Sequence, residues 1–258
     1  MSGTVAWITV TPVKGLRLAH RDEVQVTEDG VPGDRAFFLI DERGAMVSAT
    51  RLGPLVAVVP EHDAEAGSLS LRFPGGEEVT GPVELGESEG VLFSRTRVSA
   101  RPVLGAFSAA LSEHCGRSLR LFAAGDRPAV GRGRDGAVTL LSLGSLERLR
   151  EQAAEIEPVD PARFRMTFGV DGPEAHGEDS WIDRDVRVGD ALVHVTGNVG
   201  RCALTTRNPK SGVVDFKTLH HLKSFRGDVP TSEPLPFGVH ARVVEPGRVR
   251  LGDPVTPG

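Results

Sequence analysis

The stretch Pro32-Gly33-Asp34-Arg35-Ala36-Phe37-Phe38-Leu39-Ile40-Asp41-Glu42-Arg43-Gly44 shows the pattern on which the fold of this chain depends. Its apolar run, residues 36–40, has the length of one buried β-strand, and turn-forming residues bound the run on both sides. We therefore expect a strand between two tight turns. Because short apolar segments and turn signals keep alternating in both directions from here, the sequence predicts a β-rich fold with a few peripheral helices.

Other segments of strand length lie along the whole chain. Glycine and proline, 31 and 18 of the 258 residues, separate them without a fixed period. The first strands, up to residue 98, are expected to form a β-barrel or sandwich. Strands are predicted at residues 7–10, 23–26, 55–59, 69–73, 91–98, 163–170, 185–188, 191–195, 238–244 and 249–255.

Two helices and one loop interrupt this pattern. Apolar residues recur at helical spacing over residues 105–115, before Gly116 in the position of a C-cap. Ser142 is placed to cap a second helix that ends before Pro158. Residues 125–136 are rich in helix and strand breakers, and they predict a mobile inter-domain or active-site loop.

Charge and composition narrow the functional classes. The chain has 30 Lys and Arg against 35 Asp and Glu, a net charge of −5, so nucleic acid is not expected as a partner. No apolar run approaches the ~20 residues of a membrane-spanning helix, and the N-terminus lacks the pattern of a secretory signal. We expect a cytoplasmic protein with no membrane partner. Two cysteines cannot hold a four-thiolate iron–sulfur cluster, so an electron-transfer role needs a separate donor.

Cys202 is the most informative single residue of the sequence. It follows the glycine-rich segment Gly197-Asn198-Val199-Gly200 and stands directly after Arg201, whose charge favours a thiolate. Such a thiolate is suited to be a nucleophile, a redox thiol or a soft metal ligand. The alternative is a small buried core residue. Cys115, at the end of a predicted helix, is interpreted as structural.

Four basic residues stand at predicted strand ends or turns: Lys14, Arg35, Arg51 and Arg165. If they converge, they form an anion site for a phosphate, whereas taken singly each reads as a solvated surface charge. The histidines show no zinc-site spacing. No Walker motif is present in the sequence, and no Gly-x-Gly-x-x-Gly follows a predicted strand, so the common nucleotide-binding classes are not expected.

Several segments together carry a resemblance to a known family. They are Thr11-Pro12-Val13-Lys14-Gly15, Gly33-Asp34-Arg35-Ala36-Phe37, Ser48-Ala49-Thr50-Arg51, Leu140-Leu141-Ser142, Arg163-Phe164-Arg165, Glu178-Asp179-Ser180-Trp181, Arg201-Cys202-Ala203-Leu204-Thr205-Thr206 and Val249-Arg250-Leu251-Gly252-Asp253-Pro254-Val255. In this order the chain resembles the MOSC proteins that have an N-terminal MOSC β-barrel domain, such as the molybdenum amidoxime-reducing components. The resemblance implies an N-terminal β-barrel-like domain at residues 1–122 and a MOSC β-barrel domain at residues 123–258, with a cofactor cleft between them.

The same resemblance implies a site and an activity. Cys202 would ligate molybdenum in the molybdopterin cofactor and be the catalytic residue. Lys14, Arg35, Arg51 and Arg165 would hold the pterin and its phosphate, and Arg201 would favour the Cys202 thiolate. Thr167, Thr205 and Asp135 are added as further cofactor contacts. The implied reaction is the reduction of small N-hydroxylated or N-oxygenated substrates, with electrons from a separate flavin, iron–sulfur or small cytochrome protein.

Two other hypotheses remain open at this stage. In one, the chain handles the molybdenum cofactor or carries sulfur on Cys202, similar to the MOSC domain of molybdenum cofactor sulfurases. In the other, a divergent MOSC fold works without molybdenum. The observations behind the second are departures from the pattern of the amidoxime reducers at Val199, Met166, Thr167 and Val239.

Overall fold

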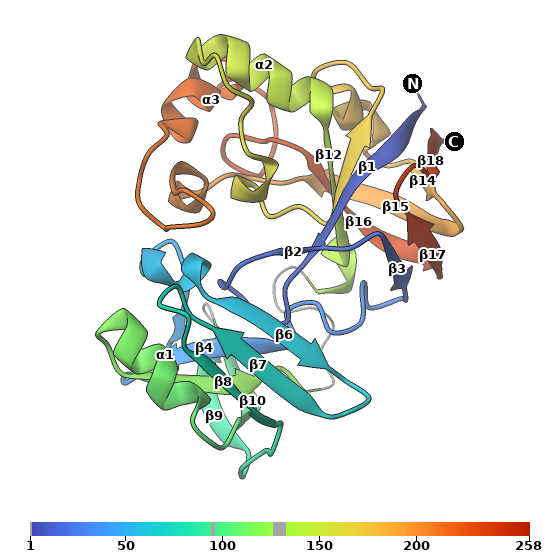
Figure 1. Cartoon of the computed structure of the whole chain (residues 1–258). Coiled ribbons are helices and arrows are strands. Elements are labelled where there is room, and N and C mark those ends of the chain that lie inside the picture. The colour runs from blue at the N-terminus through green and yellow to red at the C-terminus, as the bar shows by residue number, and fades with distance from the viewer. Residues whose placement is uncertain (1, 94–95, 126–132) are drawn as a thin grey trace.

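The computed structural model describes residues 2–93, 96–125 and 133–258. Figure 1 shows two lobes, one coloured mainly blue to green and the other mainly yellow to red. The first β-strand of the chain lies in the second lobe, beside strands from the C-terminal half, and both termini lie there. The β-rich class with a few helices, predicted from the sequence, is confirmed.

A closed barrel of seven strands forms the second lobe. Its strands are β1 (Gly3–Val10), β12 (Val138–Ser142), β13 (Phe168–Asp171), β14 (Asp185–Val188), β15 (Ala191–Asn198), β16 (Val239–Glu245) and β18 (Pro254–Pro257). They pair in the order β13-β12-β16-β15-β14-β18-β1, and pairing of β1 with β13 closes the ring. The short strand β2 (Ala19–His20) extends this sheet beside β1, and β3 (Glu23–Val26) and β17 (Gly247–Arg250) form a separate two-stranded sheet.

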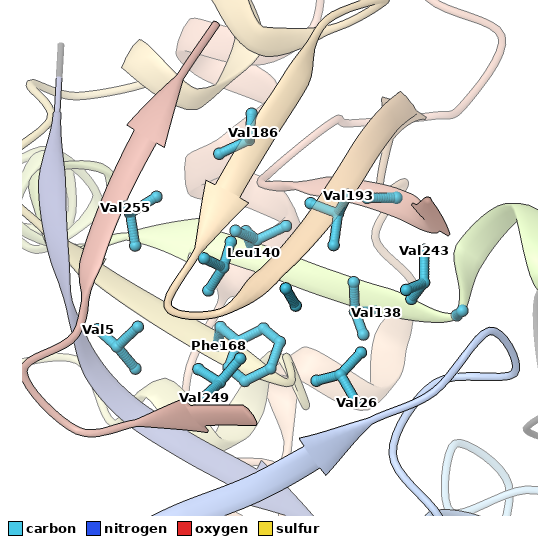
Figure 2. Packing of buried hydrophobic residues seen from close by; sticks show 14 of the residues in the cluster. Val5, Val26, Val138, Leu140, Phe168, Val186, Val193, Val243, Val249 and Val255 are labelled. Atoms are coloured by element: carbon cyan, nitrogen blue, oxygen red, sulfur yellow. The ribbon is translucent and has the colours of Figure 1, made fainter. Parts of the chain in front are cut away.

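Valine dominates the interior of this barrel. Figure 2 shows Val5, Phe168, Val186, Val193 and Val255 clustered in the interior, where each is 2% exposed or less. These side chains come from strands at both ends of the sequence. β-Branched side chains suit such an interior because they lose little rotamer freedom on a pleated surface.

The first lobe packs two sheets and a helix around a separate core. One sheet has the order β5-β4-β11-β10-β9 and the other the order β6-β7-β8. The bounds are β4 (Phe37–Asp41), β5 (Met46–Val47), β6 (Val59–Asp63), β7 (Ser68–Arg72), β8 (Glu78–Pro82), β9 (Glu89–Phe93), β10 (Thr96–Pro102), β11 (Leu119–Ala123) and the helix α1 (Phe107–Cys115). Leu39, Leu55, Leu69, Leu111 and Leu121 meet in its core. This arrangement confirms the β-barrel-like N-terminal part.

The two predicted helices form, and a third was missed. α1 ends at Gly116, whose φ of 62° is the left-handed C-cap conformation. The hydroxyl of Ser142 accepts a hydrogen bond from the backbone of Ser145 at 3.1 Å and caps α2 (Leu143–Ala153). α3 (Thr218–Arg226) packs beside α2, but its many polar residues gave the sequence no clear apolar stripe.

Four predicted strands differ from the structure. Residues 55–59 mostly lie in a 3₁₀-helix (Gly53–Ala57), because a short apolar run after a proline also suits a helical turn. Of the strand predicted at 163–170, only residues 168–170 are extended, within β13 (Phe168–Asp171), since Pro161 starts another 3₁₀ turn (Pro161–Arg163). The segments predicted at 91–98 and 249–255 each contribute to two strands, β9 and β10, and β17 and β18.

The structure bears only in part on the expected domain boundary and on the loop of residues 125–136. The division at residue 122 stays a prediction, and the structure adds that β1 and β3 pair with strands of the C-terminal half. Most of the predicted mobile loop, residues 126–132, lies outside the described residues. Among the helices that the structure describes, none has the length and apolar character needed to cross a membrane.

A tight contact across the β1–β13 seam closes the barrel. Trp7 pairs with Gly169, and the register shifts between Val5 and Trp7. A Cβ added at Gly169 would lie 1.9 Å from Cε3 and 2.1 Å from Cδ2 of the Trp7 indole. The indole therefore occupies the space that a side chain at position 169 would need.

We predict that Gly169→Ala destabilises the protein by about 2 kcal/mol or more, because the added methyl group overpacks the seam. Urea unfolding measures the change. In a Trp7→Ala background the same substitution should cost almost nothing, because its obstacle is gone. Equal costs in the two backgrounds would contradict the steric explanation.

A buried polar cluster lies beneath the N-terminus of α2. Glu178 accepts hydrogen bonds from the hydroxyls of Ser142 and Ser145, at 2.7 and 2.8 Å. Nδ1 of His176 lies 3.3 Å from the Ser145 hydroxyl, while its buried Nε2 has no hydrogen-bond partner among the described residues. Burial, assisted by the nearby Arg226 guanidinium, lowers the pKa of His176 to about 4. Burial also raises the pKa of Glu178.

We predict a specific loss of stability in mild acid. The fold keeps His176 neutral, so its contribution is complete above the ordinary histidine pKa of 6.5 and is lost as the pH falls toward 4. Between pH 7 and pH 4, the wild type should lose roughly 3 kcal/mol more unfolding free energy than His176→Gln. The contribution of Glu178 is common to both proteins.

Urea unfolding at a series of pH values measures this difference. The exposed His20 offers a control, since His20→Gln should follow the wild-type profile. Parallel profiles for the wild type and His176→Gln would show that burial does not control this titration.

Candidate functional site

A cavity of about 530 Å³ lies between the two lobes. Its lining from the N-terminal half includes Lys14 and Arg35, and from the C-terminal half it includes Arg165 and Cys202. Seven of the residues singled out from the sequence line this one cavity. They are Lys14, Arg35, Arg165, Thr167, Arg201, Cys202 and Thr205.

Arg35 and Arg165 meet although 130 residues separate them in the chain. Nη2 of Arg35 donates to the carbonyl oxygen of Arg165 at 3.0 Å, and Nη2 of Arg165 donates to the carbonyl oxygen of Leu16 at 2.7 Å. Asp34 is buried, forms an ion pair with Arg35, and accepts a hydrogen bond from the backbone of Thr11 at 2.8 Å. Carbonyl and carboxylate oxygens thus hold both guanidinium groups beside the cavity.

Arg165 is under electrostatic strain, and both arginines have an unusual backbone conformation. Burial, together with the neighbouring Arg35 guanidinium, lowers the pKa of Arg165 to about 9, and Asp34 opposes the shift. Arg35 and Arg165 also have φ angles of 53° and 54°, in the left-handed region that residues with a Cβ seldom adopt. Each such conformation costs on the order of 1–3 kcal/mol and is typical of ligand-binding positions.

Cys202 supplies an exposed thiol to the other part of the cavity wall. It follows β15 and stands at the N-cap of a 3₁₀-helix (Ala203–Thr206). The hydroxyl of Thr50 lies 3.7 Å from its sulfur atom. Arg207 fixes Thr50 by donating from Nη2 to the Thr50 carbonyl oxygen at 3.0 Å. The exposed position excludes the buried-core alternative for Cys202.

Arg201 anchors the loop that carries the thiol. Its side chain is 7% exposed and donates to the carbonyl oxygens of Phe164 and Phe237, the former at 3.0 Å. The guanidinium also lies over the Phe164 ring, 5.2 Å from its centre. The backbone of Arg201 donates to the Pro234 carbonyl oxygen at 2.9 Å. These contacts fix the backbone directly before Cys202.

Two predicted threonines have structural hydrogen bonds. The hydroxyl of Thr167 lies 3.2 Å from the hydroxyl of Thr139, which also accepts from the Thr167 backbone at 2.8 Å. The hydroxyl of Thr205 donates to the Cys202 carbonyl oxygen at 3.0 Å. Each threonine therefore stabilises a segment of the wall.

Arg51 and Asp135 do not line the cavity, although Thr50 and Gly136 next to them do. Both are exposed, and the carbonyl oxygen of Asp135 accepts from Thr196 at 2.5 Å. Sequence reasoning also missed lining residues, including Thr50, Thr139 and Glu233. Thr50 stands inside a segment that carried the family resemblance, whereas nothing in the sequence pointed to Glu233.

Comparisons with known proteins agree with this geometry. The MOSC N-terminal β-barrel domain matches residues 2–118, and the MOSC domain matches residues 126–256. The chain belongs to the MOSC family. The resemblance seen in the sequence is thereby confirmed, since both domains follow in the expected order.

The relatives of this MOSC protein include amidoxime-reducing proteins. It is 29% identical to mitochondrial amidoxime-reducing component 1 of Xenopus laevis, covering 98% of this chain and 81% of the relative. It is 28% identical to mitochondrial amidoxime reducing component 2 of Rattus norvegicus, covering 98% and 82%. Among solved structures, the YUAD protein from Bacillus subtilis matches with a TM-score of 0.47 at 10% identity, covering 100% and 96%.

Proposed function

We propose that this MOSC protein binds a pterin-type molybdenum cofactor and reduces N-hydroxylated compounds by two electrons. The observation that carries the proposal is one cavity lined by an exposed thiol and by a strained pair of arginines. The amidoxime-reducing names of its relatives support the same reaction class. Electrons would come from a separate donor protein, and the cytoplasmic location expected from the sequence stays a prediction.

The residues present fit such a cofactor. A single thiolate is a suitable soft ligand for a metal that arrives already bound to a pterin dithiolene. Among the described residues, no group of three or more His, Cys, Asp and Glu side chains could hold a metal ion. The cavity volume lies within the range of small-molecule sites.

Lys14, Arg35 and Arg165 form a basic wall of the cavity, and this wall has the electrostatics of an anion site. A phosphate beside Arg35 and Arg165 would offset the burial, and the repulsion by Arg35, that lower the pKa of Arg165. Guanidinium groups bind phosphate through paired hydrogen bonds, and Lys14 adds a further charge to the same wall. We therefore assign the phosphate to Arg35 and Arg165, and the adjoining part of the pterin to Lys14.

The overall reaction converts R–NH–OH, two electrons and two protons into R–NH₂ and water. The bound cofactor supplies the metal-centred two-electron chemistry that the protein side chains lack. Cys202 holds the metal at the exposed part of the wall, while Thr50 and Arg201 keep the thiol and its loop in place. Thr167 and Thr205 act on the cofactor only through the wall segments that they stabilise.

We predict that the wild type, expressed in a host that makes the cofactor, contains about one molybdenum atom per chain and reduces a hydroxylamine. Cys202→Ser should lose most of the metal and the activity, because a hydroxyl group is a poor ligand for a soft metal. Elemental analysis measures the metal content. Cys115→Ser is the matched control, since burial raises the pKa of Cys115 to about 11 and its thiol lies outside the cavity.

Molybdenum content and turnover, measured together, distinguish the enzyme, the cofactor carrier and the divergent MOSC protein. Molybdenum without turnover would favour a cofactor carrier over an enzyme. Folded protein without molybdenum would refute the proposal and favour a divergent MOSC protein or a sulfur carrier.

We predict that Arg165→Ala lowers molybdenum and phosphorus content at least fivefold while changing the unfolding free energy by no more than about 1 kcal/mol. The lost hydrogen bond to Leu16 is offset by relief of the repulsion with Arg35. Elemental analysis and urea unfolding measure the two quantities. Arg184→Ala removes an exposed arginine as a control. Unchanged phosphorus content would place the phosphate elsewhere.

A further inference from the structure

We propose that residues 207–223 form the docking surface for an electron-donor protein whose own surface is acidic around its redox centre. The inference rests on the proposed function, because such a reductase receives its two electrons from outside. The surface lies beside the cavity and combines exposed lysines with a pair of exposed valines. A one-electron donor would dock and be oxidised twice for each substrate molecule reduced, while the two protons come from water.

The loop of residues 207–214 connects this surface to the thiol. It begins directly after the 3₁₀-helix that follows Cys202. Nη2 of Arg207 donates to the Thr50 carbonyl oxygen at 3.0 Å, and the Thr50 hydroxyl lies 3.7 Å from the sulfur atom of Cys202. Electron transfer between proteins slows steeply with distance, so a donor bound on this loop is well placed to reach the cavity.

Hydrogen bonds fix the conformation of this loop. The Asn208 side chain accepts from the backbones of Lys210 and Ser211 at 2.9 and 3.1 Å, and it donates to Asp215 at 2.9 Å. Asp215 also accepts two hydrogen bonds from Arg163, at 2.7 and 3.0 Å. A preorganised loop loses little conformational freedom on binding, so its exposed groups are well suited to recognise a partner.

The loop exposes two adjacent valines. Val213 and Val214 are 62% and 60% exposed. Their loop is pressed against the first lobe, since a Cβ added at Gly212 would lie 2.0 Å from the carbonyl oxygen of Gly53. The valines therefore stay at the surface. A small apolar centre surrounded by polar side chains is typical of a protein interface.

Lysine is concentrated around these valines. The chain has four lysines, and three of them, Lys210, Lys217 and Lys223, are exposed on this surface. Within the residues that the structure describes, no carboxylate forms an ion pair with any of the three. Residues 201–227 contain six of the 30 Lys and Arg but only one of the 35 Asp and Glu. A positive surface on a chain with a net charge of −5 favours an acidic partner.

Charge complementarity around a small apolar centre suits a brief encounter. Oppositely charged faces bring two proteins together quickly, at rates that fall as salt screens the charges. Redox complexes bury little area, so one loop and one helix face are sufficient. α3, orange in Figure 1, buries Leu222 and leaves His220 and Lys223 exposed next to this loop. The surface therefore fits a small acidic redox protein.

The test measures binding of two small acidic redox proteins, a plant-type [2Fe–2S] ferredoxin and a flavodoxin. Calorimetry uses the purified full chain, with molybdenum content measured on the same sample. At least one of the two should bind at ~50 mM salt and bind at least tenfold more weakly at ~200 mM, because salt screens the lysines. Binding of neither protein would overturn the inference.

Two pairs of substitutions locate the binding. Lys217→Glu with Lys223→Glu should weaken binding at least tenfold and reduce its dependence on salt. Val213→Ser with Val214→Ser should weaken binding about fivefold and leave the salt dependence unchanged, because an apolar contact is lost and no charge is changed.

The matched controls change exposed residues outside this surface. Arg97→Glu with Arg242→Glu, on β10 and β16, reverses the same number of charges, and Val244→Ser on β16 removes an exposed valine. Both controls should bind like the wild type. Folded lysine or valine variants that bind as tightly as the wild type would contradict the proposed surface.

Reduced methyl viologen, a small dye that needs no docking surface, separates docking from the reaction. With a hydroxylamine as substrate, the dye should drive the lysine variant at the wild-type rate, whereas reduced ferredoxin or flavodoxin should drive it at least tenfold more slowly at low salt. Equal protein-driven rates would overturn the inference and leave the reductase in place. Lysine-dependent binding by protein without molybdenum or dye-driven turnover would support the docking surface and refute the reductase.

Two other occupants would give different results. A dimer in analytical ultracentrifugation that Val213→Ser with Val214→Ser dissociates would assign the surface to a second copy of the chain. Binding to phosphatidylserine vesicles that Lys217→Glu with Lys223→Glu abolishes, without binding of either redox protein, would assign it to an anionic membrane. Either result would overturn the inference.

Discussion

The pairing of the first strand with β13 is the interaction on which the candidate site depends. It closes a barrel whose other strands all come from the C-terminal half. It also fixes Thr9 against the segment before β13, through a backbone hydrogen bond to Thr167 at 2.9 Å and a hydroxyl bond to Met166 at 2.5 Å. The chain then passes from Val10 into the first lobe. The closed barrel therefore sets the relative position of the two cavity walls.

The pairing of β1 with β13 also sets the position of the basic wall. The backbone of Arg35 donates to Thr11 at 2.6 Å, and the backbone of Lys14 donates to Phe37 at 2.8 Å. Both basic residues are thereby tied to the turn that leaves β1, directly opposite Arg165. Two neighbouring arginines with left-handed backbone, of which only Arg35 forms an ion pair with the buried Asp34, cost folding free energy. A bound anion offsets that cost, so the local strain is consistent with a site shaped for binding.

The sequence was sufficient for most of the elements, α3 and the 3₁₀-helix Gly53–Ala57 excepted, but not for their convergence. Local signals predicted the strands, the capped helices and the glycine-rich loop before Cys202, because turn chemistry and apolar spacing are local properties. The meeting of Arg35 with Arg165 depends on the register of β1 against β13, which no local pattern contains. The family resemblance supplied the pairing of these two arginines. The resemblance also pointed to Arg51 and Asp135, which lie outside the cavity lining although adjacent residues contribute to the lining.

The departures from the amidoxime-reducer pattern occur where packing absorbs them. Val199, Met166 and Thr167 are at most 6% exposed, and Val239 lies fully buried in the barrel core, outside the cavity lining. Met166 also accepts a hydrogen bond from Arg201 at 3.0 Å through its sulfur atom. Because Val199, Met166 and Thr167 also line the cavity, these departures change the wall next to the thiol loop and leave Lys14, Arg35 and Arg165 in place.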